Sequence, residues 1–428
     1  MHLFSAVGLA AAVLAAGCGR DTTSRTTFTA SNAAEAIARV TVDCGACAWD
    51  TIGNEAVVLK LSLDGGPSQH LPVVRTGRAE YRVMLGAVAA GNHTVTITED
   101  AELTAVDLRG KSAATFSIEI DQVTPSDAGY EPLSMAPLVY ARPDTVGRFT
   151  DVPVLMWYEI EPSPKGRRYR YSVIFSNEDG GTPADRLMAT WGRTTDIEYV
   201  YSVEVDASGT IVSEDMQGPD HEILTFSGRR EGRHPLLWVS TENNMVLDRG
   251  ETTVRYAPVP ALVLLSQVSR EAVMDANPWT YEVMSKELQR EGKIAADAPP
   301  GRGSVPDPRR FVFLEGCGEA GANALSSSVK VDGAWVASDR GVPDYRVTRD
   351  GCFRMAIPLP GNATAGTVQA VRVQAFARQD RPPSQSRFTR LNTLFSLDEK
   401  FAPGPRVIAW EGTAVLEAGG APLEIPIR

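Results

Sequence analysis

Short alternating segments separated by turn residues dominate this chain of 428 residues. In residues 79–85 (AEYRVML) and 94–98 (TVTIT), apolar and polar side chains alternate with a period of two, as in strands that are buried on one face only. Glycine-containing turns at 64–66 and 90–92 separate such segments,. The pattern predicts a mainly β protein of tandem antiparallel β-sandwich domains, the first of which, residues 32–123, is immunoglobulin-like.

Three further regions complete the predicted organisation. Residues 132–260 read as a β-rich middle domain and residues 309–428 as a C-terminal β-sandwich-like domain,. Residues 261–308 lie between them and are predicted to form a helical connector followed by a Pro/Gly-rich loop. The one connecting helix should begin after Asn277, with a proline in its first turn, and end at Gly292,.

An apolar run at the N-terminus ends in the motif LAAGC, residues 14–18. The run is shorter than the roughly 20 residues that a helix needs to cross a bilayer, which favours a cleaved signal peptide over residues 1–17. Small residues directly before a cysteine resemble the lipobox of bacterial lipoproteins, and this resemblance implies that Cys18 carries a lipid. An ordinary secretory signal with an incidental cysteine is the alternative, and both interpretations export the chain.

The segment after the cysteine and the total charge indicate the location and the partners. Residues 18–31 are predicted to be a lipid-anchored tether, which would hold the protein on a membrane. Gly19 differs from the Asp that retains lipoproteins at the inner membrane, so we expect a bacterial cell envelope protein, with the outer membrane favoured over the inner membrane. The formal net charge of −11 is distributed along the chain, which argues against a nucleic-acid partner.

Four cysteines remain once Cys18 is set aside, an even number that suits an oxidising compartment,. Two local disulfides are the most economical pairing, Cys44 with Cys47 and Cys317 with Cys352. A redox-active CxxC motif is the alternative for the first pair. However, the residues after Cys47 indicate a turn, whereas redox motifs lie at the N-terminus of a helix.

The middle domain contains the densest group of polar side chains. Asp196 and Glu198 flank one residue of a predicted strand, so both carboxylates would lie on the same face, within reach of one hard cation,. With His221 or Glu178 they could form a Ca²⁺ or Mg²⁺ site. The alternatives are solvated carboxylates paired with nearby arginines, and the carboxylate pair of a glycosidase, for which Asp179 and Glu198 are candidates.

Residues 192–198, with the sequence GRTTDIE, resemble the Gly-His-Arg-His-Asp-Trp-Glu heptapeptide of the necrosis-inducing secreted proteins. Gly192, Asp196 and Glu198 match that motif, while its two histidines and its tryptophan are absent. The acidic residues of the family's motif bind a divalent cation in a β-sandwich, so the resemblance implies a metal at Asp196 and Glu198. We carry over no activity of that family.

The motifs favour a protein without enzymatic activity. No Gly-x-Ser-x-Gly or His-Glu-x-x-His motif occurs, so a serine hydrolase or a zincin is not indicated. We predict an exported, lipid-anchored envelope protein that acts as a binding or assembly component for a protein or glycan ligand and needs no cofactor. The alternative is a metal-dependent or paired-carboxylate hydrolase acting on polysaccharide, with Ca²⁺ or Mg²⁺ as the metal.

Overall fold

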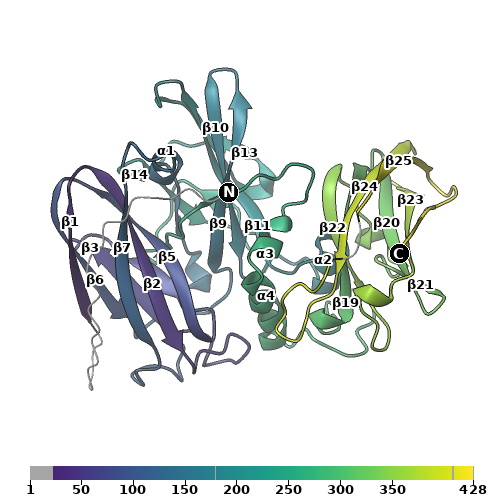
Figure 1. Ribbon diagram of the computed structural model, residues 1–428, viewed down its shortest axis with the longest axis horizontal. Coiled ribbons are helices and arrows are strands. Elements are labelled where there is room, and N and C mark those ends of the chain that lie inside the picture. Colours follow the sequence, from purple (N-terminus) through teal and green to yellow (C-terminus); the bar gives the residue numbers. More distant parts are fainter. Residues whose placement is uncertain (1–22, 179, 407–408, 428) are drawn as a thin grey trace. The chain divides into compact units, whose positions relative to one another are not determined.

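The computed structural model describes residues 23–178, 180–406 and 409–427 (Figure 1). It confirms a mainly β fold of tandem antiparallel sandwiches. The chain forms two compact units, the first comprising Met1–Gly180 with Asp196–Val263 and the second Gly181–Thr195 with Leu264–Arg428. Cys18 and the predicted signal peptide lie outside the described residues. No helix among the described residues is long and apolar enough to cross a membrane.

The first unit begins with a sandwich of seven strands in two sheets, in which β7 pairs with β2 and not with β6, so its strand order differs from that of an immunoglobulin domain,. In its strand β6, Val95 and Ile97 are fully buried while the threonines between and beside them are partly exposed, so the period of two does correspond to one buried face. One sheet has the strand order β1 (Ser24–Ala30), β6 (Gly91–Glu99), β3 (Val58–Leu63), β4 (Gln69–Pro72), and the other β5 (Gly77–Val88), β2 (Ala34–Cys44), β7 (Thr115–Val123).

Two further sheets complete the first unit. The six-stranded sheet has the order β13 (Ile223–Thr225), β12 (Ile211–Gln217), β11 (Asp196–Asp206), β10 (Gly166–Phe175), β9 (Pro153–Ser163), β18 (Ala261–Leu262). The five-stranded sheet has the order β14 (Arg230–Glu231), β15 (His234–Val239), β8 (Leu138–Tyr140), β17 (Arg255–Tyr256), with β16 (Val246–Leu247) paired to β15. Helix α1 (Tyr130–Ser134) and 3₁₀ turns at Pro143–Thr145 and Pro219–His221 connect these strands.

Buried contacts explain why the predicted first and middle domains belong to one compact unit. The imidazole of His234 lies 3.1 Å from the Glu35 carboxylate and 2.8 Å from the carbonyl of Ala136. The backbone N–H of Met84 donates to the carbonyl of Ala257 at 2.8 Å, which pairs residues of the later segment with strand β5. The predicted regions 32–123 and 132–260 therefore belong to one compact unit.

The second unit is a sandwich of two four-stranded sheets around an aliphatic and aromatic core. One sheet has the order β22 (Gly351–Pro358), β19 (Phe311–Glu319), β24 (Gln385–Phe395), β25 (Trp410–Glu417), and the other β21 (Ala334–Ala337), β20 (Asn323–Val331), β23 (Ala370–Ala377), β26 (Leu423–Pro426). Its helices are α2 (Ala184–Trp191), α3 (Ala272–Ala276) and α4 (Trp279–Arg290), and its 3₁₀ turns are Pro308–Arg310, Pro343–Tyr345 and Ala365–Thr367.

Helix α4 is the connecting helix that the sequence predicts, and its apolar stripe is buried. Tyr281, Met284 and Leu288 are each at most 1% exposed. The predicted cap differs from the observed one, because the side chain of Asn277 donates to the carbonyl of Val273 at 2.9 Å and closes α3 instead. The sequence pattern did not distinguish the end of one helix from the start of the next.

Both predicted disulfides are present. Cys44 at the end of β2 is bonded to Cys47 in the turn that follows. Cys317 and Cys352 lie directly opposite each other in the antiparallel pair of β19 and β22, and their sulfurs join these strands. The pairing leaves Cys18 as the one cysteine without a disulfide partner within the sequence.

Candidate functional site

The predicted acidic group lies at the start of β11, where Asp196 and Glu198 are 2% and 8% exposed. Asp196 accepts a hydrogen bond from the side-chain amide of Asn244 at 3.0 Å. Glu198 accepts one from the amide of Gln217 at 3.1 Å. These carboxylates are therefore buried and bound to amide donors, and are not solvated at the surface.

Of the predicted partners of this pair, the structure describes His221 and Glu178. Nδ1 of His221 is 2.6 Å from the amide nitrogen of Gln217, which therefore lies between His221 and Glu198. Glu178 is partly exposed, and Asp179 lies outside the described residues. Among the residues that the structure describes, no group of three or more His, Cys, Asp or Glu side chains is arranged to hold a metal ion.

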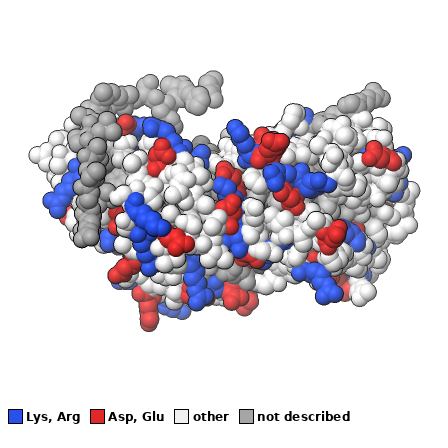
Figure 2. Space-filling model, turned by 90° about the horizontal axis from the view of Figure 1, so that it is seen from below, with Lys and Arg blue, Asp and Glu red and all other residues white. Residues whose placement is uncertain are grey.

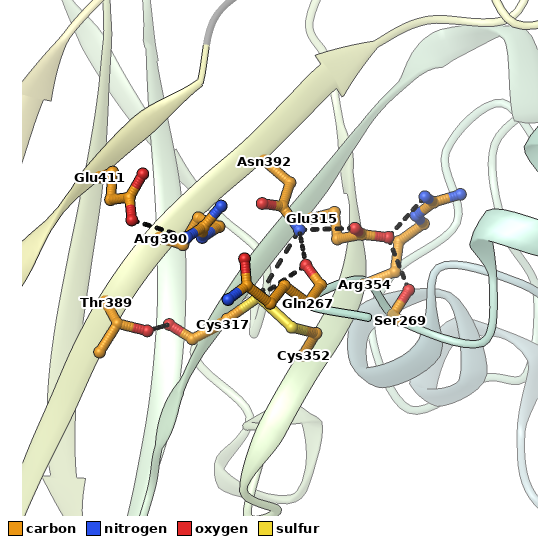
Figure 3. Close-up of a disulfide and its surroundings, with 10 residues drawn as sticks. All are labelled: Gln267, Ser269, Glu315, Cys317, Cys352, Arg354, Thr389, Arg390, Asn392 and Glu411. Carbon is orange, nitrogen blue, oxygen red and sulfur yellow. Dashed lines mark hydrogen bonds and ion pairs between the residues drawn. A yellow bond between two sulfur atoms is a disulfide. The ribbon is translucent and has the colours of Figure 1, made fainter. Parts of the chain in front are cut away.

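A second candidate site, which the sequence did not indicate, is an open pocket of about 500 Å³ in the second unit (Figure 3). Its floor is the Cys317–Cys352 disulfide, and its walls come from β24, β25 and the segment that precedes α3. The lining residues are Gln267, Cys317, Cys352, Thr389, Arg390, Glu411, Gly412 and Thr413.

Irregular strand pairing shapes this pocket. The register between β19 and β24 shifts at Cys317, and the register between β24 and β25 shifts between Phe388 and Arg390. Such irregularities turn side chains out of the regular alternation. A Cβ atom at Gly412 would lie 2.7 Å from the ring of Trp410, so a larger residue here would displace that ring.

The pocket presents an ion pair to solvent. Nη2 of Arg390 lies 2.7 Å from Oε1 of Glu411, whose side chain is 73% exposed. The hydroxyl of Thr389 donates to the carbonyl of Cys317 at 3.2 Å. The site thus combines guanidinium donors, carboxylate acceptors and a hydroxyl, but within it we find no nucleophile activated by a neighbouring base.

Asn392 links the pocket to a buried ionic network behind it (Figure 3). Its amide donates to the carbonyl of Gln267 and to Oε1 of Glu315, both at 2.8 Å. The other carboxylate oxygen of Glu315 accepts from the hydroxyl of Ser269 and from Nη2 of Arg354, both at 2.7 Å. These hydrogen bonds hold the residues next to the floor of the pocket in place.

Arg354 is the centre of that network, with a side chain that is only 1% exposed. It forms a bidentate pair with Asp275, with distances of 2.6 and 2.7 Å, and donates to the hydroxyl of Tyr281 at 2.6 Å. Burial alone would lower the pKa of Arg354, but Tyr281, Asp275 and Glu315 hold it well above its usual value. Gly192 ends α2 with φ of 64°, and a Cβ there would lie 2.6 Å from Cγ of Arg354.

A second buried pair adjoins this network. Nε of Arg193 lies 3.1 Å from the carboxylate of Glu271. Burial would raise the pKa of Glu271, but attraction to Arg193 and Arg349 outweighs it and lowers this pKa to about 2. Arg349 stacks on the ring of Trp191 at 3.6 Å, and burial lowers its pKa to about 10. Glu271 is therefore ionised at neutral pH and has no capacity to act as a general acid.

Residues of the 192–198 segment belong to both candidate regions, for different reasons. Gly192 and Arg193 support the ionic network of the second unit, whereas Asp196 and Glu198 lie in a strand of the first. The positions that match the heptapeptide of the necrosis-inducing proteins are thus divided between two structural roles. For Gly192, the close approach of Arg354 is a sufficient physical reason for glycine.

Comparisons with known proteins leave the chain without a family. No family model matches it, and no curated protein matches it significantly. One solved structure, described as NLPPya in complex with mannosamine, is similar over 32% of this chain and 74% of its own length, with 12% identity and a TM-score of 0.24. A similarity at this level supports no conclusion about fold or function.

Proposed function

We propose that the protein is an exported, lipid-anchored component of a bacterial cell envelope, with the outer membrane favoured, and that it binds a polar ligand such as a glycan. The proposed site is the open pocket above the Cys317–Cys352 disulfide. The observation that carries this proposal is the ion pair of the partly exposed Arg390 with the exposed Glu411 in the lining of a pocket with a rigid floor.

The chemistry of the lining suits a hydroxylated ligand. A guanidinium offers only donors and a carboxylate only acceptors, so the pair can satisfy both sides of a sugar hydroxyl. Thr389, Thr413 and Gln267 add neutral polar groups. A few placed polar side chains around a concavity are the usual means by which binding sites set the orientation of a ligand.

The floor of the pocket is preorganised. The disulfide joins β19 to β22, and Asn392 ties the neighbouring segment to the buried carboxylate of Glu315. A site that is already ordered loses less conformational entropy when a ligand binds. Rigidity of this kind favours a binding role for the pocket.

Two features support export and anchoring. The first is the LAAGC motif at residues 14–18, whose resemblance to a lipobox supports a lipid on Cys18,. The second is the presence of both disulfides, which persist in oxidising compartments,. The hydrolase alternative gains no support from the contacts described here, because Asp196 and Glu198 already accept hydrogen bonds from Asn244 and Gln217.

Metabolic labelling tests the anchor. Cells that express the full chain are grown with an alkyne analogue of palmitate, and the protein is isolated and examined for label. We expect label on the wild type and none on Cys18→Ala. Equal labelling of the two proteins, or none on either, would contradict the lipid at Cys18.

Co-sedimentation tests the pocket. We expect the full chain to sediment with purified peptidoglycan sacculi or with lipopolysaccharide vesicles, and Arg390→Ala to weaken this binding about tenfold, the effect of losing one charge-assisted hydrogen bond. The matched control is Arg372→Ala, which removes an exposed ion pair with Glu424 elsewhere in the same unit. Wild-type binding by Arg390→Ala would place the ligand outside this pocket, and no sedimentation of the wild type would overturn the glycan ligand.

A further inference from the structure

Three loops meet at one end of the first sandwich. Strand β2 ends where β5 begins, since Cys44 pairs with Gly77, and β7 begins beside the same end of β2. In the other sheet, Glu99 at the end of β6 pairs with Leu59 at the start of β3. The connections 45–57, 73–76 and 100–114 therefore lie together, and we call this end of the sandwich the loop pole.

The first described strand also starts at the loop pole. Ser24, the first residue of β1, pairs with Ile97 near the end of β6. Cys18 is six residues before Ser24 in the sequence. Because an extended chain spans at most about 3.5 Å per residue, those six residues reach no further than about 21 Å. A lipid on Cys18 would therefore keep the loop pole within that distance of a bilayer surface.

Two aliphatic side chains are exposed at the tips of these loops. Ile52 is 75% exposed and Val106 is 63% exposed. The two tips adjoin each other, because the backbone N–H of Asp107 donates to the carbonyl of Gly53 at 2.8 Å. An Ile and a Val side by side at the surface form a small apolar protrusion, which is unfavourable in water.

The loops that carry these side chains are rigid. The turn around Ile52 is closed by hydrogen bonds from Ala48 to Asn54 and from Thr51 to Ala48, with distances of 2.7 and 2.8 Å. The Cys44–Cys47 disulfide fixes its start. The neighbouring loop is held by Arg109, whose guanidinium donates to two backbone carbonyls of the same loop. The exposed position of Ile52 and Val106 is thus built into the fold.

We propose that the loop pole lies against the membrane that holds the lipid of Cys18, with Ile52 and Val106 inserted into the interfacial region of the bilayer. The inference rests on the lipid anchor of the proposed function. Two aliphatic side chains are too few to hold a protein on a membrane by themselves. On a protein that is already tethered, the effective concentration of the bilayer is high, and the same side chains suffice to orient it.

The charges of the loop pole do not favour an electrostatic contact with anionic lipids, so the proposed contact rests on its apolar side chains. Its three loops contain more Asp and Glu than Lys and Arg, and on the face drawn in Figure 2 the two signs are interspersed. Peripheral proteins that bind anionic lipids use clusters of basic residues instead. The contact should therefore not be strengthened by anionic lipid, and high salt should not weaken it.

Photo-crosslinking tests the inference on the lipidated full chain. Benzoylphenylalanine replaces Ile52, Val106, Ile223 or Val415 one at a time, and each protein is reconstituted in vesicles of phosphatidylethanolamine and phosphatidylcholine that contain a clickable phospholipid. Ile223 and Val415 are matched controls, being exposed aliphatic residues of β13 and β25. After irradiation, the yield of lipid adduct is measured for each position.

We expect adduct yields at positions 52 and 106 to exceed those at 223 and 415 at least fivefold, and neither to fall at high salt nor to rise after addition of phosphatidylglycerol. Equal yields at the four positions, on protein whose Cys18 lipid is verified by palmitate labelling, would overturn the inference and leave the anchor intact. Absence of palmitate labelling would overturn both. Yields that rise with phosphatidylglycerol and fall with salt would replace the apolar contact with an electrostatic one.

Discussion

Asp196 and Glu198 in the first unit accept hydrogen bonds from neutral amides, whereas Asp275 and Glu315 in the second unit pair with a guanidinium. All four carboxylates are buried, but the consequences of losing the donor differ. Removal of an amide leaves a hydrogen bond unmade, whereas removal of Arg354 takes a guanidinium from two buried carboxylates, of which Asp275 keeps Arg406 at 3.0 Å,. The network around Arg354 is therefore more vulnerable to a single substitution than the acidic pair of the first unit.

Replacement of Arg354 should have the largest effect. Arg354→Met keeps much of the side-chain volume but takes the arginine from Glu315 and leaves Asp275 with Arg406, and breaking a buried ion pair in this way costs about 3–5 kcal/mol,. We expect the free energy of unfolding of the second unit, measured by urea denaturation, to fall by that amount. A loss below 1 kcal/mol would show that the network is dispensable.

Replacement of Glu271 should have the next largest effect on the free energy of unfolding, and this effect should depend on pH. Its pKa is lowered to about 2 by Arg193 and Arg349 despite burial, so its ionised form stabilises the fold above pH 4.5, and this contribution disappears as the pH falls towards 2. We expect Glu271→Gln to be less stable than the wild type by about 3 kcal/mol at pH 7, with the difference vanishing near pH 2. Unfolding measured across this range checks the trend.

The exposed carboxylate of Glu424 provides the control for that titration. It pairs with Arg372 at the surface, so Glu424→Gln should leave the pH profile of stability parallel to that of the wild type. A difference between wild type and Glu271→Gln that stays constant from pH 7 to pH 2 would contradict the ionised, arginine-bound state of Glu271.

Smaller effects are expected for the acidic pair of the first unit. The isosteric double variant Asp196→Asn and Glu198→Gln should lose about 1–2 kcal/mol, because each site retains its shape and an acceptor oxygen. We also expect the melting temperature to be the same with and without added Ca²⁺, for the variant and for the wild type. A Ca²⁺-dependent rise in the wild type that the double variant abolishes would restore the predicted metal site.

The smallest effect is expected for the exposed ion pair of the second unit. Arg372→Ala removes a contact of 2.7 Å to Glu424, whose side chain is 52% exposed, and such pairs contribute about 0–1 kcal/mol. The comparison with Arg354→Met then measures the effect of burial on the same guanidinium chemistry. Equal losses in the free energy of unfolding for the two variants would mean that burial does not change the contribution of the arginine.

Features with a local signature were predictable. The period of two in residues 94–98 corresponds to a strand with Val95 and Ile97 inside, and the spacing of the cysteines led to both observed disulfides. The position of Asp196 and Glu198 in one strand was also predicted. Their burial was not, because it depends on Asn244 and Gln217, which lie 48 and 19 residues further along the chain.

The ionic network and the pocket had no comparable signature. Arg354 lies 79 residues from Asp275 and 39 from Glu315, so no spacing rule relates the three. Arg390 and Glu411 meet only because β24 and β25 are adjacent strands. Long-range pairings of this kind follow from the register of the sheets, which the alternation pattern alone does not specify.

The sequence by itself determined the mainly β architecture and the disulfide pairing, because each depends on residues that are close in the chain or on composition, and the lipid at Cys18 stays a prediction. The tertiary structure alone decided which charges are buried together and which polar groups surround a pocket. It also decided that the loops bearing Ile52 and Val106 lie at the end of the sandwich where β1 starts. The physical reason is that burial and pairing energies depend on distances in space, which only the assembled sheets define.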